Sequence, residues 1–345
     1  MRIGLIPEGL RERALFESRR FPQPVFDVMG TMLLSRAVMA GARFGVFDRL
    51  AGGPKTAPEL AAEAGCDAHG MTLLVDALVA CCYLQPAGDR YRNSRLGDWL
   101  VSRRPQTLAN FVLFNYDQWE WIGHLEEFIQ SGRARSIHEQ LQGLEWRTYL
   151  LGLEDLARLS ASALASKLKL GPAARRLLDV GGGHGYYSVA LCQRYPALRA
   201  TVIDLEPAAE VGRERVAQAG LSGRIEFRPG NLKDTPFGDN HDVALVLNLL
   251  HHLDEPTCRA TLRRLHAALA PAGKLVVWET FRAERPERQR DQLGSLMALF
   301  FGVTSGRETY EFEQVAEWVR AAGFTRLRRE KLRTAPFAGL LLAVK

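Results

Sequence analysis

The segment from Arg175 to Glu279 alternates short apolar runs with longer stretches of helical character. Five runs, rich in leucine or β-branched residues and bounded by turn residues, read ARRLLDV, RATVIDL, RIEFRPG, HDVALVLNLL and GKLVVWET. This alternation predicts a parallel, doubly wound sheet, and hence an α/β fold. Two later runs, TRLRREKL and FAGLLLAVK, are separated only by Arg333 to Pro336, which permits a hairpin but no parallel crossover. We therefore expect a mostly parallel seven-stranded sheet whose last strand is antiparallel, at or near the edge.

All five runs end in glycine or polar residues although their interiors are apolar. Ligands of open α/β sheets bind beyond the carboxyl ends of the strands, so these ends together predict a binding site. In chain order the ends are Asp179-Val-Gly-Gly-Gly-His-Gly185, Asp204, Gly230-Asn231, Leu250-His251-His252 and Glu279.

The glycine loop after the first run favours S-adenosylmethionine over a dinucleotide. A dinucleotide fingerprint that starts at Gly181 and Gly183 requires a small residue where this chain has Tyr186. Asp179 would place an anion near a pyrophosphate, whereas S-adenosylmethionine has no phosphate and carries ammonium and sulfonium charges. Asp204, about 20 residues beyond the loop, suits hydrogen bonding to ribose hydroxyls in either cofactor.

His251 is the candidate general base. Methyl transfer to oxygen is faster when the attacking hydroxyl is deprotonated, and a phenol of pKa about 10 needs a neighbouring base such as an imidazole. A carboxylate on the second ring nitrogen would fix the tautomer and stabilise the imidazolium. Glu279, at the neighbouring strand end, and Glu308, in Gly306-Arg-Glu-Thr309, are both candidates for that carboxylate.

The N-terminal part predicts a winged helix that serves dimerisation. Thr56-Ala-Pro-Glu59 is a capping-box pattern, a second helix follows from about Ala68, and two short strand-like runs end near Ser94. The second helix, AHGMTLLVDALVACC, has no Lys, Arg, Asn or Gln to read base edges, which disfavours DNA binding. Val25 to Leu50 carries more apolar residues than one helical stripe needs, so we expect burial on more than one side.

Residues 106–170 are expected to form helices that cover the sheet and contribute to an acceptor pocket. The domain organisation predicted is 1–105 for dimerisation, 106–170 as a helical connector and 171–345 for cofactor binding and catalysis. Aromatic and methionine side chains suit a flat apolar acceptor. The candidate acceptor-binding residues are Tyr116, Trp119, Asn248, Met297, Phe300 and Phe301.

These motifs resemble the class I S-adenosylmethionine-dependent O-methyltransferases of the plant caffeate and bacterial polyketide-tailoring type. The resemblance covers nearly the whole chain through the winged-helix start and, in order, DVGGGHG, VIDLEP, NLLHHLDE, GKLVVWE and GRETYEFEQVAEWVRAAGF. It implies His251 as base, Glu279 and Glu308 as its partners, S-adenosylhomocysteine as product and a homodimer. The expected cofactor-binding residues are Asp179, Gly181, Gly183, Tyr187, Asp204, Leu205, Gly230, Asn231 and Leu232.

Three positions depart from the family pattern. His252 replaces an Asp after the base, Asn231 replaces an Asp near the adenine, and Leu247 replaces a cation. Members of this fold also include enzymes that methylate nitrogen or carbon, or that catalyse decarboxylation, hydroxylation or pericyclic reactions. These remain alternatives, as does a ligand-sensing DNA-binding regulator; the identity and regiochemistry of the acceptor stay open.

Composition narrows the setting of the protein. The 345 residues carry a formal charge of +6, but the arginines are spread along the chain beside acidic residues, as on an ordinary solvated surface. The odd number of cysteines, five, has no C-x-x-C pair, which favours a reducing cytoplasm over a disulfide framework. The charged N-terminus is unlike a signal peptide, and we expect no membrane span, no nucleic-acid partner and no metal.

Overall fold

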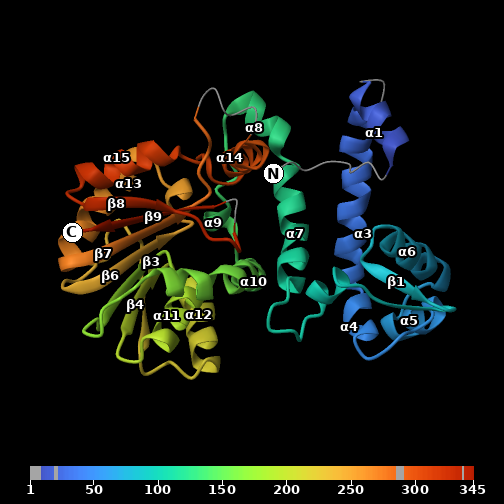
Figure 1. The fold of residues 1–345 in the computed structure, drawn as a ribbon, viewed down its shortest axis with the longest axis horizontal. Helices are drawn as coiled ribbons and strands as arrows, with labels where there is room; N and C mark the ends of the chain where they lie inside the picture. Colours follow the sequence, from blue (N-terminus) through green and yellow to red (C-terminus); the bar gives the residue numbers. More distant parts are fainter. Residues whose placement is uncertain (1–8, 19–21, 285–290, 336–337) are drawn as a thin grey trace. The chain divides into compact units, whose positions relative to one another are not determined.

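The computed structural model describes residues 9–18, 22–284, 291–335 and 338–345. It contains two compact units, one formed by residues 2–116 and the other by residues 117–345 (Figure 1). The boundary lies inside helix α7 (Ala109–Ile122), so the predicted connector, 106–170, is shared between the two units.

The N-terminal unit has the predicted order of helix, helix and hairpin. α5 (Ala57–Ala64) begins with the expected capping box, in which the Thr56 hydroxyl and the Glu59 carboxylate each accept from the other residue's backbone N–H. α6 (Ala68–Ala80) follows, and β1 (Leu84–Ala87) pairs antiparallel with β2 (Arg90–Asn93). The other elements are α1 (Leu10–Glu17), α2 (Gln23–Val25), the π-helical turn η1 (Phe26–Gly30), α3 (Thr31–Arg43), α4 (Val46–Leu50) and η2 (Gly97–Leu100).

The apolar segment Val25 to Leu50 differs from its prediction. Its second half is buried, with Phe47 only 1% exposed, but Val28 and Leu33 are 71% and 57% exposed in the single chain. Burial on more than one side is therefore wrong for the first half, because the small core around α5, α6 and the hairpin includes this segment only from Val38 onward. The expectation of no membrane-length apolar helix also needs correction: within the described residues Gln23–Arg43 is long and apolar enough, by length and composition alone.

The C-terminal unit contains a seven-stranded sheet with strand order β5-β4-β3-β6-β7-β9-β8. The first five strands in this order run parallel, and β9 pairs antiparallel with both β7 and β8. The predicted hairpin and antiparallel last strand are therefore confirmed, with β8 at the edge. The strands are β3 (Arg176–Val180), β4 (Arg199–Asp204), β5 (Ile225–Pro229), β6 (His241–Leu247), β7 (Leu269–Glu279), β8 (Thr325–Glu330) and β9 (Gly339–Val344).

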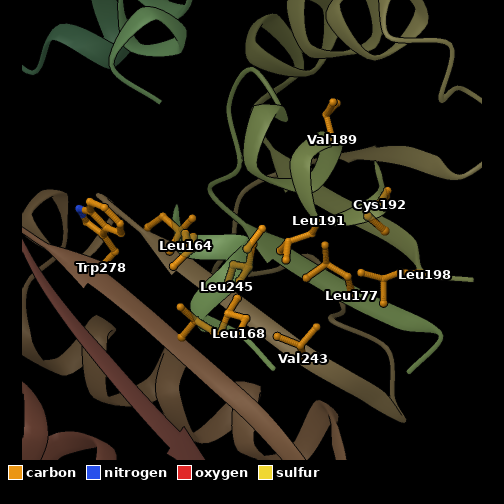
Figure 2. Close-up of a cluster of buried hydrophobic side chains, with 14 of the residues drawn as sticks. Leu164, Leu168, Leu177, Val189, Leu191, Cys192, Leu198, Val243, Leu245 and Trp278 are labelled. Atoms are coloured by element: carbon orange, nitrogen blue, oxygen red, sulfur yellow. The ribbon is translucent and has the colours of Figure 1, made fainter. Parts of the chain in front are cut away.

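Helices cover both faces of this sheet. One apolar cluster joins the sheet to α10 and α11, and Figure 2 shows Leu164 of α10 and Leu168, just after this helix, beside Leu245 and Trp278 of the sheet. A second cluster packs α13 and α15 against the opposite face. The helices are α8 (Leu125–Ser131), α9 (Ile137–Gln140), α10 (Leu144–Lys167), α11 (Tyr186–Arg194), α12 (Glu206–Gln218), η3 (Leu250–His252), α13 (Glu255–Ala268), α14 (Gln292–Ser305) and α15 (Phe312–Ala321).

The fourth strand, β6, ends earlier than its apolar pattern suggests. Asn248 has a φ of +52°, a left-handed conformation that asparagine tolerates better than most residues, so the extended chain stops there. The backbone N–H of Asn248 still donates to the backbone carbonyl of Trp278 at 2.8 Å. His251 consequently lies in the 3₁₀ turn η3 after the strand rather than at the strand end itself.

Candidate active site

The glycine loop connects β3 to α11 and lies against the end of β4. Gly183 N–H donates to the Asp204 carboxylate at 2.7 Å, and Gly181 N–H donates to the Ile203 carbonyl at 2.8 Å. A β-carbon on Gly182 would lie 2.5 Å from Val202, so only glycine fits this approach. The sequence therefore folds a loop that presents backbone groups and Asp204 at one edge of the sheet.

Two carboxylates lie at this loop, that of Asp179 buried and that of Asp204 partly buried. Burial raises the pKa of Asp179 to about 7, opposed by a 2.7 Å hydrogen bond from the Ser188 hydroxyl and reinforced by the charge of Asp204. Burial also raises the pKa of Asp204, although the N–H groups of Gly183 and Leu205 donate to it. Buried anions of this kind are stabilised by an incoming cation. The site thus fits a cofactor that carries ammonium and sulfonium charges.

The remaining predicted cofactor residues lie around the same edge. Tyr187, on α11, hydrogen-bonds the Ser160 hydroxyl at 2.9 Å, and burial raises the pKa of its phenol to about 12. Gly230 and Asn231 follow β5, with Asn231 exposed and its side-chain oxygen accepting from Lys233 N–H at 3.0 Å. The other two residues, Leu205 and Leu232, are half-buried after β4 and β5.

His251 forms a close pair with Glu279. His251 Nδ1 lies 2.6 Å from Glu279 Oε2, and the two side chains are only 7% and 4% exposed. Glu279 Oε1 accepts from the backbone N–H groups of Leu249 and Leu250, each at 2.7 Å. Because the carboxylate can only accept, Nδ1 is the donor and the lone pair of the neutral ring lies on Nε2. The geometry is that of a histidine whose tautomer is fixed by a buried carboxylate.

Glu308, the other predicted partner of His251, is placed elsewhere. Its carboxylate is about half exposed and forms an ion pair with Arg282. Backbone contacts bring these two residues together. Arg282 N–H donates to the Tyr310 carbonyl at 2.9 Å, and Arg282 forms an isolated parallel β-bridge with Glu311. The structure brings Glu279 to His251 and brings Glu308 to a neighbouring arginine.

The predicted acceptor-binding residues divide into three groups. Met297, Phe300 and Phe301 lie on α14, and the Phe301 ring stacks on His251 with a centroid distance of 3.9 Å and an interplanar angle of 20°. Asn248 is exposed directly before η3. Tyr116 and Trp119 lie on α7.

Tyr116 and Trp119 belong to different units. Tyr116 is in the N-terminal unit, where the guanidinium groups of Arg36 and Arg43 lie over its ring, each 4.8 Å from the ring centroid. Trp119 is in the C-terminal unit and is 39% exposed. These contacts give Tyr116 a cation–π packing role in its own unit.

Sequence reasoning missed two residues beside the base. His138, on α9, lies edge-on to His252 with a centroid distance of 4.6 Å, and its Nε2 lies 3.1 Å from the hydroxyl of Tyr149 on α10. His252, noted only as a departure from the family pattern, lies 4.2 Å from the ring of His251. A four-residue helix has too little periodicity to be found from sequence, so His138 gave no signal.

These features define a class of protein. The parts of an S-adenosylmethionine-dependent methyltransferase are present: a sheet of this topology, a glycine loop flanked by two carboxylates, and a histidine held by a carboxylate in the turn after β6. The comparison with known proteins makes this more specific.

A family model described as an O-methyltransferase domain matches residues 128–325, and one described as an O-methyltransferase dimerisation domain matches residues 26–103. The chain therefore belongs to the O-methyltransferase family and is an S-adenosylmethionine-dependent methyltransferase, as the sequence predicted.

Similar proteins cover nearly the full length. The 3-hydroxy-5-methyl-1-naphthoate 3-O-methyltransferase of Streptomyces sahachiroi is 26% identical over 332 residues, which is 94% of this chain and 95% of that protein. The mitomycin biosynthesis 6-O-methyltransferase of Streptomyces lavendulae is 26% identical over 85% of this chain and 86% of that protein. Human N-acetylserotonin methyltransferase, solved with S-adenosylmethionine, shares the fold with a TM-score of 0.81 at 22% identity and covers 98% of each chain.

Proposed function

We propose that this enzyme transfers a methyl group to a hydroxyl of an aromatic or polycyclic small molecule in secondary metabolism, with His251 as the general base. The observation that carries the proposal is the buried pair of His251 and Glu279, joined at 2.6 Å. A hydroxyl acceptor needs a base to take its proton, and a carboxylate on Nδ1 leaves Nε2 free to do so.

Each residue has a defined task in this reaction. Asp179 and Asp204, with the glycine loop, would hold the cofactor, which supplies an electrophilic methyl group on its sulfonium. His251 Nε2 takes the proton of the acceptor hydroxyl, and Glu279 stabilises the imidazolium that forms. The stacked ring of Phe301 favours the same cation through its π face. Alignment of acceptor oxygen and methyl group, with water excluded, contributes much of the acceleration.

The acceptor class follows from the side chains near the base. Met297, Phe300 and Phe301 on α14 are half-buried or buried and offer an apolar, polarisable wall to a flat ring system. The relatives named above act on a hydroxynaphthoate and in mitomycin biosynthesis, which are ring compounds of this kind. The candidate panel is therefore hydroxynaphthoates, hydroxyanthraquinones and catechol.

Replacement of the base tests the proposal. We expect His251→Ala to bind S-adenosylhomocysteine within twofold of the wild type in calorimetry, while turnover of the best panel member falls about 10²- to 10⁴-fold. His266→Gln is the matched control, because His266 lies on α13 against Phe324 and away from the loop. Retained turnover in His251→Ala, measured as release of S-adenosylhomocysteine, would remove the base from the proposal.

An aromatic amine added to this panel separates hydroxyl from amine acceptors. A neutral amine is already nucleophilic, so its methylation has less need of a base. If an aromatic amine is methylated faster than every hydroxyl compound, and His251→Ala slows it less than tenfold, the acceptor atom is nitrogen and the hydroxyl assignment fails.

A homodimer completes the proposal. The exposed apolar residues of the helix Gln23–Arg43 lie in the segment matched by the dimerisation-domain model, and a second copy of this chain would cover them. We place the enzyme in the cytoplasm, in keeping with its free cysteines within the described residues.

A further inference from the structure

A continuous group of rings extends from the base toward the cofactor loop, and an inference about it rests on the proposed role of His251. The Phe301 ring stacks on His251 with a centroid distance of 3.9 Å, and the His252 ring lies 4.2 Å from His251 and 5.6 Å from Phe301. His138 meets His252 edge-on at 4.6 Å and 87°, and Tyr149 meets His138 at 5.4 Å and 72°. The base is thus one ring in a packed series.

Packing against neighbouring rings holds His252 in place. Within the described part of the chain its Nδ1 is buried and has no hydrogen-bond partner, so no hydrogen bond at this nitrogen fixes the rotation of the ring. Its position depends on the rings of His251, Phe301 and His138 that surround it. Because such packing transmits strain, a shift of one of these rings moves His252 as well.

His138 is the anchored member of the series. Its Nε2 is 3.1 Å from the Tyr149 hydroxyl, and its helix is tied to α14 by a 2.8 Å bond from Arg135 N–H to the Val303 carbonyl. Burial, together with the neighbouring charge of His251, lowers the pKa of His138 to about 4. At neutral pH His138 is therefore uncharged and contributes contact rather than charge.

Tyr149 connects this series to the cofactor side. It lies partly buried on α10, where desolvation and the Asp204 carboxylate raise the pKa of its phenol. The next residue, Leu150, lies 3.2 Å from the position that a β-carbon on Gly183 would occupy. The helix turn that anchors His138 is therefore packed on the glycine loop itself.

We propose that Tyr149 and His138 are positioning residues for the base. The Tyr149 hydroxyl fixes the ring of His138, the edge of His138 fixes His252, and His252 with Phe301 confines His251 so that Nε2 meets the acceptor hydroxyl. Glu279 sets the tautomer of His251, whereas the contact with the rings of His252 and Phe301 sets the tilt of the His251 ring.

Two variants that remove the same hydrogen bond test the proposal. In Tyr149→Phe and His138→Phe the ring remains and the hydrogen bond is lost; we expect kcat for the best panel acceptor to fall about tenfold in each. The affinity for S-adenosylhomocysteine should change less than twofold. The double variant should be no slower than either single variant, since both remove one shared contact. Tyr195→Phe is the control, because it removes a partly buried 2.6 Å hydrogen bond from the Tyr195 hydroxyl to the Leu168 carbonyl in the same unit.

A second readout needs no acceptor. In the complex with S-adenosylhomocysteine, ring ¹⁵N resonances of selectively labelled histidine should shift for His251 and His252 in Tyr149→Phe and remain unchanged for His241 and His266. Tyr195→Phe should leave all four unchanged. This readout reports ring positions and would not respond to a general loss of stability.

Three results would overturn the inference. They are a kcat of Tyr149→Phe within twofold of the Tyr195→Phe control, a cofactor affinity that falls by the same factor as kcat, and unshifted resonances of His251 and His252. Failure of the base assignment is separate, since it appears as retained turnover in His251→Ala whatever Tyr149→Phe does.

Discussion

Replacement of Glu279 by glutamine changes the charge beside the base with little change in volume. Glu279 is buried, and both of its oxygens are engaged: Oε2 with His251 Nδ1 and Oε1 with two backbone N–H groups. A glutamine can satisfy only one of these sides. If its oxygen keeps the two backbone donors, its NH₂ group faces His251 Nδ1, which must then give up its proton and accept.

The consequence for the base can be worked out from this geometry. With Nδ1 as acceptor, the ring proton moves to Nε2, which removes the lone pair that would accept the proton of the acceptor hydroxyl. A hydrogen bond to a charged group contributes about 1.5–3 kcal/mol, or roughly 10- to 150-fold in rate. The wrong tautomer adds to this, and the equivalent acid-to-amide exchange in a hydrolase triad costs about 10⁴ in kcat. We expect kcat of Glu279→Gln to fall about 10³-fold.

The assay is release of S-adenosylhomocysteine at saturating cofactor and acceptor, with calorimetry to show that the cofactor still binds. Glu308→Gln is the matched comparison, because Glu308 pairs with Arg282 at the surface rather than with His251. We expect a loss below tenfold there. Equal losses in the two variants, or a loss below tenfold in Glu279→Gln, would refute the reasoning.

Three further predictions concern binding, stability and assembly. Because the pKa of Asp179 is raised to about 7, the folded apoprotein holds a proton that the unfolded chain releases near pH 4, and the stability that this proton gives is lost as the pH rises from about 4 to about 7. Asp179→Asn should therefore raise the apoprotein Tm more at pH 8 than at pH 5, and it should weaken cofactor binding. Glu154→Gln should lower the free energy of unfolding in urea by about 3–5 kcal/mol, because it leaves one arginine on α10 and one on α12 without their buried carboxylate. Glu206→Gln, at an exposed ion pair, should lower it by less than about 1 kcal/mol. Leu33→Glu should sediment as a monomer and Leu144→Glu as a dimer, and a dimeric Leu33→Glu would exclude this helix face from the interface.

The sheet and its polar edge could be predicted because the signals are local. Alternating apolar runs mark the strands, and the residue after each run marks the edge, so Asp204 and Glu279 were found directly. The capping box at Thr56 and the hairpin after Arg333 depend on neighbouring residues in the same way. Such features require no knowledge of which distant segments meet.

Other features depend on contacts that the sequence does not specify. Glu308 was expected beside His251 because both follow the family pattern, but a backbone bridge near Arg282 brings it to that guanidinium. His138 reaches His252 only because α9 folds back beside α14. The exposed half of the apolar N-terminal helix was expected to be buried, and its composition reflects a surface that a single chain leaves uncovered.

The two ends of the site have opposite electrostatic character, and this accounts for the position of each carboxylate. Desolvation raises the pKa values of Asp179 and Asp204, so a bound cation lowers the free energy of their charged forms before any reaction occurs. At the other end His251 is neutral at the start and gains a positive charge only when it takes the acceptor proton. Glu279, at 2.6 Å, is the group that lowers the free energy of that charge. The neighbouring His138 and His252 have lowered pKa values and remain neutral, so they place no competing charge beside the imidazolium. Glu279 therefore acts most strongly where charge develops, which is the condition for a rate effect rather than a binding effect.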